Sequence, residues 1–198
     1  MKVIGIVGGI ASGKSFYTDI FESQGAVTFK ADEVAHDVLN ERTIKEKIRQ
    51  RWGEEIINDN GTVNRPKLAQ IVFQGTEDSD MERLYLESLI YPPLKKRFER
   101  FLDECESNDV YYIILDAALL LEANWDKMCD AIVFIDTPEE VRLERAKTTR
   151  GWTETEFRAR EASQFSIKKK KKRCQFTLDG LAKKDDAVKA VEELLKQI

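Results

Sequence analysis

The sequence predicts an α/β protein in which a five-stranded parallel sheet lies between two layers of helices. Short apolar runs rich in β-branched residues alternate with stretches whose apolar residues recur at helical spacing. Such alternation is typical of parallel strands joined by right-handed crossover helices. Polar or glycine residues directly follow the runs, at the positions where the carboxyl ends of parallel strands would form one shared cleft.

The expected strands are four strong apolar runs and a weaker fifth run near the carboxyl end. Helical patterns separate them, as a sheet covered on both faces requires. The strands are expected at Val3–Val7, Ala26–Phe29, Tyr111–Asp116, Ala131–Asp136 and Gln175–Leu178. Helices around them are expected at Phe16–Ser23, Glu33–Leu39, Pro138–Arg150 and Asp185–Ile198.

The segment after the first strand, Gly8–Ser15, matches the pattern G-x-x-x-x-G-K-[ST] of a phosphate-binding loop. Its glycines let backbone N–H groups turn inward around a phosphate, and the following helix presents an N-terminus that favours anions. Lys14 would bind the β- and γ-phosphates, and the Ser15 hydroxyl would bind Mg²⁺. We expect the nucleotide to contact Gly9, Ile10, Ala11, Ser12, Gly13, Lys14, Ser15 and Phe16.

A long stretch without a strand signal separates the second and third strands. Helical patterns occupy Ile44–Arg51, Arg65–Phe73 and Met81–Glu104, and Pro92-Pro93 should break or start a helix in the last of these. This is more than a crossover needs, so it predicts a substrate-binding insertion. We expect a single domain with core segments 1–40, 108–140 and 174–198, a helical insertion at about 41–107 and a lid at about 141–173.

The expected lid is dense in basic residues. Thr153 and Glu156 form a capping-box pattern that predicts a helix start. At least two of the arginines here should face phosphate, because guanidinium groups bind phosphate oxygens in a bidentate way. The candidates are Arg142, Arg145, Arg150, Arg158 and Arg160. The run Lys168–Lys172 is expected to be a solvated helix face, with attraction of anionic substrates as the alternative.

Three acidic residues follow strands. Asp32 could accept a proton from an attacking hydroxyl or cap the next helix. Asp116 suits a water-mediated Mg²⁺ contact, with a cap or turn role as the alternative. Asp136, followed by Thr137-Pro138, is expected to cap a helix. The only histidine, His36, is by composition alone a structural or surface residue.

Composition limits the classes of protein that remain. The chain has 198 residues and a formal net charge of −4, which gives no support for nucleic-acid binding. We expect no membrane partner and a cytoplasmic location, because no apolar run approaches a membrane span and no signal peptide is evident. The scattered Cys105, Cys129 and Cys174 predict packing residues rather than disulfides or a zinc site.

Taken together, the motifs resemble the dephospho-coenzyme A kinase family from about residue 2 to 180. The phosphate loop is one of them. The others are Ala31-Asp32-x-x-Ala35-His36, Val63-Asn64-Arg65-x-x-Leu68-x-x-Ile71-Val72-Phe73, Leu86-Glu87-x-x-Ile90-x-Pro92, Asp116-x-x-Leu119-Leu120-x-Glu122 and Ala159-Arg160-x-Ala162-Ser163-Gln164.

The resemblance implies a P-loop NTPase fold of the nucleoside monophosphate kinase type. It implies transfer of the ATP γ-phosphate to the ribose 3′-hydroxyl of dephospho-CoA. It assigns Asp32 as the base, with Lys14 and Arg145 as further catalytic residues and Arg142 as an ATP ligand. Mg²⁺ would be held by Ser15 and Asp116. Substrate contacts are expected from Asp32, His36, Asn64, Arg65, Tyr91, Asp116, Leu119 and Arg160.

The chain departs from the family pattern at several positions. Lys30 stands where the family often has Asp, and Tyr91 where His usually precedes Pro92. Ala118, Gln175 and Gly180 replace a usual Pro, Asp and Asn, and Arg150 is shifted by one position. Two alternatives therefore stay open: a kinase for another small acceptor (nucleoside, nucleotide or sugar acid), and a non-catalytic nucleotide-binding protein. The oligomeric state is expected to be a monomer or a weak homo-oligomer.

Overall fold

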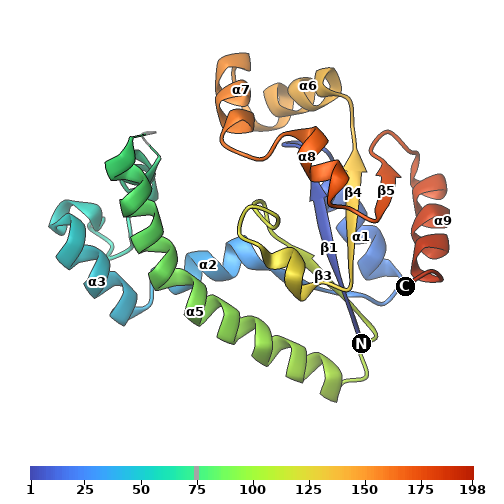
Figure 1. Cartoon of the computed structure of the whole chain (residues 1–198), viewed down its shortest axis with the longest axis horizontal. Coiled ribbons are helices and arrows are strands. Elements are labelled where there is room, and N and C mark those ends of the chain that lie inside the picture. The colour runs from blue at the N-terminus through green and yellow to red at the C-terminus, as the bar shows by residue number, and fades with distance from the viewer. Residues whose placement is uncertain (74–75) are drawn as a thin grey trace. The chain divides into compact units, whose positions relative to one another are not determined.

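The computed structural model describes residues 1–73 and 76–198, which divide into two compact units (Figure 1). The sheet unit comprises Met1–Lys30 and Glu104–Ile198, and the helical unit comprises Ala31–Asp103. The helical unit thus starts ten residues before the insertion expected at about 41–107. The reason is that Val38 and Leu39 pack into the apolar core of the helical unit.

All five strands of the sheet unit are parallel, in the order β2-β3-β1-β4-β5. Their bounds are β1 Lys2–Gly8, β2 Val27–Lys30, β3 Tyr112–Asp116, β4 Ala131–Asp136 and β5 Phe176–Asp179. Each lies within one residue of its expected position. The predicted fold class is confirmed. The central strand, β1, is almost wholly buried, which explains its unbroken apolar sequence.

Two helices cover one face of the sheet. They are α1 (Lys14–Ser23) and α9 (Lys184–Leu195), which Figure 1 shows on the same side of the strands. Tyr17 and Phe21 of α1 share a core with Ile4 of β1 and Val191 of α9, and all four are nearly inaccessible to solvent. This core anchors the end of β1 and the start of α1, and so fixes both ends of the phosphate loop.

The expected lid region forms three short helices that pack near the phosphate loop. They are α6 (Glu139–Arg150), α7 (Glu154–Ala162) and α8 (Ile167–Lys172). The predicted capping box of Thr153 and Glu156 is present at the start of α7. Ala146 of α6 and Phe157 of α7 bury themselves with Ile10 in a small apolar cluster. That cluster attaches α6 and α7 to the loop.

The helical unit has its own apolar core. Its helices are α2 (Ala31–Leu39), α3 (Arg42–Trp52), the 3-10 turn η1 (Glu54–Ile56), α4 (Arg65–Val72) and α5 (Glu77–Ser107), of which the last residues belong to the sheet unit. Ile48, Ile56 and Leu68 are among its fully or nearly fully buried side chains. The expectation that Pro92-Pro93 would break or start a helix is wrong, because α5 continues through both prolines. Leu89, Leu94 and Phe98 are buried on either side of them, and tertiary packing outweighs the local loss of helix propensity.

None of the helices in the described part of the chain is long and apolar enough to cross a membrane.

In the sheet unit, the 3-10 turn η2 (Trp125–Met128) follows β3 and precedes β4. Leu120, Leu121 and Trp125 are buried there. The segment between β3 and β4 is therefore part of the packed interior rather than a loose crossover.

Candidate active site

The phosphate loop joins the end of β1 at Gly8 to the start of α1 at Lys14. Gly13 caps α1 with φ 95°, in the left-handed region that glycine occupies without strain. Ala11 also has a positive φ, 58°, which costs energy in a residue that carries a Cβ and is typical of functional loops. Ser12 is 1% exposed, and its N–H donates to the Gly9 carbonyl at 3.2 Å.

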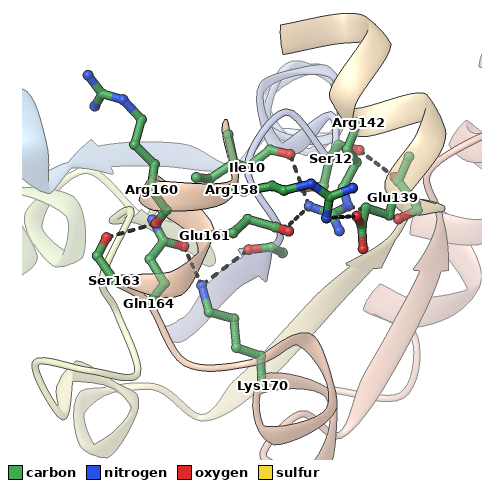
Figure 2. A network of polar contacts seen from close by, with 12 residues as sticks. Ile10, Ser12, Glu139, Arg142, Arg158, Arg160, Glu161, Ser163, Gln164 and Lys170 are labelled. Atoms are coloured by element: carbon green, nitrogen blue, oxygen red, sulfur yellow. Dashed lines mark hydrogen bonds and ion pairs between the residues drawn. The ribbon is translucent and has the colours of Figure 1, made fainter. Parts of the chain in front are cut away.

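Arg142 of α6 lies against the loop and is only 3% exposed. Its Nε donates to the Thr137 carbonyl at 3.0 Å, and Nη1 donates to the Ile10 carbonyl at 3.5 Å. Nη1 also forms a short ion pair with Glu161 of α7, which Figure 2 shows reaching toward the guanidinium. A Cβ at Gly9 would lie 2.5 Å from Nη1, so only glycine permits this approach. The side chain expected to bind ATP is thus engaged with the loop itself.

Arg145, one turn further along α6, binds the carbonyl of Ser12, two residues beyond Ile10 in the loop. Its Nη1 donates to the Ser12 carbonyl at 3.2 Å, and Nη2 donates to the Gly180 carbonyl at 3.0 Å. Thr137 Oγ1 donates to the same Ser12 carbonyl at 2.7 Å. Gly180 is closely packed, because a Cβ there would lie 1.7 Å from Thr137 Oγ1. The loop is therefore connected to the ends of β4 and β5.

Lys170 of α8 corrects the expectation that Lys168–Lys172 is a uniformly solvated face. It is 1% exposed, whereas its four lysine neighbours are exposed. Its Nζ donates to Gln164 Oε1 at 2.7 Å and to the Gly8 carbonyl at 3.4 Å, and it pairs with Glu122 at 3.4 Å. Burial lowers the pKa of this ammonium; Glu122 opposes that shift and Lys14 adds to it.

The other lid arginines lie on or near the surface. Arg150 and Arg160 place their guanidinium groups 4.9 Å and 4.3 Å from the centre of the Trp152 ring. Arg158 forms ion pairs with Glu139 and Glu154 and is largely exposed. In this structure Arg142 and Arg145 of α6 contact the phosphate loop, and the contacts are to its carbonyl oxygens.

Asp136 does not cap a helix as expected. Its carboxylate pairs with Lys171, and α6 starts at Glu139 with Pro138 at the N-cap position and no side-chain cap. The carbonyl of Asp136 accepts from the Gly180 N–H at 2.8 Å. The residue therefore ties the end of β4 to α8 and to the end of β5.

The expected Mg²⁺ ligands, Ser15 and Asp116, both belong to the sheet unit. Ser15 lies in the first turn of α1, and Asp116 ends β3 opposite Ile6 of β1 and Lys30 of β2. Among residues 1–73 and 76–198, no group of three or more His, Cys, Asp or Glu side chains could hold a metal ion. A hydroxyl and a carboxylate nevertheless fit Mg²⁺, which keeps several waters and takes further ligands from phosphates.

The remaining predicted site residues fall mostly in the helical unit. Helix α2 begins directly after β2, and Asp32 is its second residue. Asp32 therefore lies inside the helix and does not precede it as a cap. His36 lies in the last turn of α2, and its buried Nδ1 has no hydrogen-bond partner among the described residues. Asn64 caps α4, since its Oδ1 accepts from the Lys67 N–H at 3.1 Å. Arg65 is the first residue of α4 and is exposed.

Tyr91 lies within α5, next to Pro92. Burial, with a smaller contribution from Glu87, raises the pKa of its phenol to about 12. Tyr91 therefore stays neutral at any physiological pH and can offer a hydroxyl rather than a charge. Leu119, in the sheet unit, is 40% exposed, which leaves its side chain accessible to a ligand.

Comparison with known proteins identifies the family. The family model described as dephospho-CoA kinase matches residues 2–186. The chain belongs to the dephospho-CoA kinase family. A dephospho-CoA kinase of Carboxydothermus hydrogenoformans is 32% identical over 181 residues, which cover 91% of this chain and 86% of that protein. A dephospho-CoA kinase of Arabidopsis thaliana is 33% identical over 200 residues, which cover 100% of this chain and 84% of that protein.

A crystal structure from Thermus thermophilus has the same fold. It matches with a TM-score of 0.86 at 24% identity, covering 100% of this chain and 97% of that one. The prediction of a dephospho-CoA kinase family member, made from the motifs, is confirmed. The fold and the family model thus agree over nearly the whole chain.

Sequence reasoning missed several residues around the phosphate loop of this dephospho-CoA kinase family member. Glu122 and Gln164 were found only as motif positions without a role, and both bind Lys170. Glu161, which pairs with Arg142, had no signal that separates it from other acidic residues of α7. The contact of Thr137 with the phosphate loop could have been predicted, because a hydroxyl beside the end of a strand is well placed to bind a neighbouring loop.

Proposed function

We propose that this chain transfers the γ-phosphate of ATP to the ribose 3′-hydroxyl of dephospho-CoA, giving CoA and ADP. The observation that carries the proposal is the phosphate loop between β1 and α1, in a chain of the dephospho-CoA kinase family. The named relatives support the choice of acceptor. Transfer from ATP to an alcohol needs positioning and charge stabilisation more than covalent chemistry by the protein.

The donor half of the reaction belongs to the sheet unit. Backbone N–H groups from Gly9 to Phe16 bind the phosphates, and Lys14 neutralises charge on the β- and γ-phosphates. Arg142 and Arg145 hold loop carbonyls in this structure, and their positive charge adds to the potential that attracts ATP. The loop is thus presented to ATP as a preorganised anion site.

Mg²⁺ accompanies ATP in this proposal. Ser15 and Asp116 would hold it, the latter through a water molecule. When bound, the ion neutralises charge on the β- and γ-phosphate oxygens. The hydroxyl of Ser15 on α1 and the carboxylate of Asp116 at the end of β3 would position the ion.

The acceptor half depends on Asp32 at the start of α2, on further residues of the helical unit and on three residues of the sheet unit. Asp32 orients the 3′-hydroxyl and accepts its proton as the oxygen attacks the γ-phosphorus. Further contacts with dephospho-CoA are proposed for His36, Asn64, Arg65, Tyr91, Asp116, Leu119 and Arg160. Asn64 also caps α4, so replacing it would disturb the fold as well as binding.

Replacement of Asp32 by Asn tests the proposal. Because the amide cannot accept the proton, we expect kcat to fall about 10²–10⁴-fold while ATP affinity changes little. ADP release is measured with dephospho-CoA as acceptor, and Glu33→Gln, which neutralises the neighbouring exposed carboxylate, is the control. An unchanged kcat in Asp32→Asn would contradict the role of Asp32.

The same assay tests the acceptor. Wild-type protein is supplied with ATP and, in turn, dephospho-CoA, a nucleoside, a nucleoside monophosphate and a sugar acid. We expect turnover with dephospho-CoA only. Turnover with another acceptor but not with dephospho-CoA would overturn the proposed substrate, and ATP binding without transfer to any acceptor would overturn the proposed activity.

A further inference from the structure

Helix α8 carries five consecutive lysines, and only one of them is withdrawn from solvent. Lys168, Lys169, Lys171 and Lys172 are exposed, whereas the side chain of Lys170 is 2% exposed. Burying an ammonium group costs several kcal/mol even when it is paired, and an apolar side chain of similar length would avoid that cost. Stability alone therefore does not explain a lysine at this position.

The buried ammonium of Lys170 is surrounded by oxygen atoms from three separate segments. Gln164 Oε1 is 2.7 Å away, and Glu122 Oε1 and the Gly8 carbonyl oxygen are each 3.4 Å away. Figure 2 shows the side chain of Lys170 extending from α8 toward Gln164. Glu122 Oε1 also accepts from the Phe165 N–H at 2.7 Å. The ammonium thus connects the phosphate loop to the segment between α7 and α8.

The contact to Gly8 completes a regular pattern along the loop. Alternate carbonyls, those of Gly8, Ile10 and Ser12, each accept a hydrogen bond from a cation. The three cations are Lys170, Arg142 and Arg145. When loop N–H groups face a phosphate, the carbonyls on the opposite side need other donors. These cations provide them from α8 and α6.

Because peptide bonds are planar, a cation that holds a loop carbonyl also fixes the direction of the N–H of the next residue. In a trans peptide the C=O of one residue and the N–H of the next are fixed in one plane and point in opposite directions, and the described chain contains no cis peptide bond. A cation that holds the Gly8 carbonyl therefore also fixes the direction of the Gly9 N–H. Arg142 does the same for Ala11, and Arg145 for Gly13.

We propose that Lys170 is a positioning residue for ATP, which holds the Gly8 carbonyl and thereby fixes the orientation of the Gly8–Gly9 peptide at the start of the phosphate loop. This role extends the proposed function and depends on it in one respect, namely that ATP is the ligand of the loop. The neighbouring charges suit the role. Burial lowers the pKa of the ammonium and Glu122 opposes that shift, while the ammonium lies close enough to Lys14 to interact with it electrostatically.

Three variants test the role of Lys170. Lys170→Met removes the ammonium and leaves Glu122 without its partner. The double variant Lys170→Met/Glu122→Gln removes the stranded charge as well. Lys172→Met removes an exposed lysine of the same helix and is the matched control. For each, ATP affinity is measured calorimetrically without acceptor, and the thermal unfolding midpoint is recorded.

We expect Lys170→Met to lower both the unfolding midpoint and the ATP affinity, the affinity by at least about tenfold, the lower end of the range for one hydrogen bond to a charged group. The double variant should regain most of the unfolding midpoint but not the affinity. Lys172→Met should change neither. In steady-state assays KM for ATP should rise while KM for dephospho-CoA stays unchanged, a split that a purely structural role would not produce.

The double variant decides the outcome even where Lys170→Met fails to fold. If it folds and binds ATP as tightly as the wild type, the positioning role is overturned. Selective ¹⁵N labelling of glycine adds a direct readout, because the Gly9 amide resonance should lose its ATP-induced shift in the double variant. Failure of the proposed function is separate: wild-type protein would then bind ATP but not phosphorylate dephospho-CoA.

Discussion

Basic residues around the phosphate loop of the sheet unit and basic residues of the helical unit differ in burial and in the groups that they bind. In the sheet unit, the side chains of Arg142 and Lys170 are 3% and 2% exposed, and both donate to carbonyl oxygens of the phosphate loop. In the helical unit, the ion-paired side chains of Arg49, Arg51 and Arg97 are 36–47% exposed and bind carboxylates near the surface.

This difference indicates where electrostatic interactions matter in the molecule. Stranding one member of a buried charge pair costs about 3–5 kcal/mol, whereas a partly exposed pair contributes about 0–1 kcal/mol. The expensive charges surround the loop that we propose binds ATP. Replacing a buried charged residue beside the phosphate loop should therefore lower the free energy of unfolding more than replacing an exposed one in the helical unit.

The largest effect is expected for Arg142→Met. It leaves the Glu161 carboxylate without its ion pair and the Thr137 and Ile10 carbonyls without their donor. We expect the free energy of unfolding in urea to fall by about 3–5 kcal/mol and ATP affinity to fall with it. Adding Glu161→Gln to the same chain should recover part of the stability. A loss below about 1 kcal/mol in the single variant would contradict the comparison.

A smaller effect is expected for Gly180→Ala, which tests the packing around the loop without changing a charge. The new Cβ would lie 1.7 Å from Thr137 Oγ1 and 3.0 Å from the Ser12 and Asp136 carbonyl oxygens. Thr137 must therefore move and release the Ser12 carbonyl. We expect a loss of about 1–3 kcal/mol in the free energy of unfolding, the range for overpacking.

Thr137→Ala is the control for that variant. It removes the hydrogen bond to Ser12 without the steric clash, so the expected loss is only about 1 kcal/mol. Both variants should weaken ATP binding, because both remove the hydrogen bond of Thr137 to the Ser12 carbonyl and leave that carbonyl to Arg145. If Gly180→Ala is as stable as the wild type, the close packing between the loop and the end of β5 is not a constraint.

The sequence predicted the sheet unit better than it predicted the contacts around the loop. Strand positions follow from continuous apolar runs such as Val3–Val7, because a parallel strand buried on both faces has no polar alternation to misread. The burial of Lys170 could not be predicted in the same way. Five consecutive lysines look alike locally, and only the packing of α8 against β1 selects one of them.

The helical unit shows a second reason for the limits of sequence reasoning. Pro92 and Pro93 disfavour a helix locally, yet α5 runs through them because its packing outweighs that preference. The sequence allows Asp32 to act as a base or as a helix cap, and its position inside the first turn of α2 excludes the capping role. Its proposed role as base follows from chemistry and family resemblance, neither of which propensity can supply.

The smallest effect is expected for Arg97→Met in the helical unit. Arg97 on α5 bonds Glu41 at 2.6 Å and lies 3.9 Å from Asp37, in geometry at least as good as that of the buried pairs. All three side chains are about a third or more exposed, so water replaces the lost contacts. We expect the free energy of unfolding to change by about 0–1 kcal/mol, less still at high salt. A loss as large as that of Arg142→Met would mean that short distance, not burial, sets the energy of charged pairs in this protein.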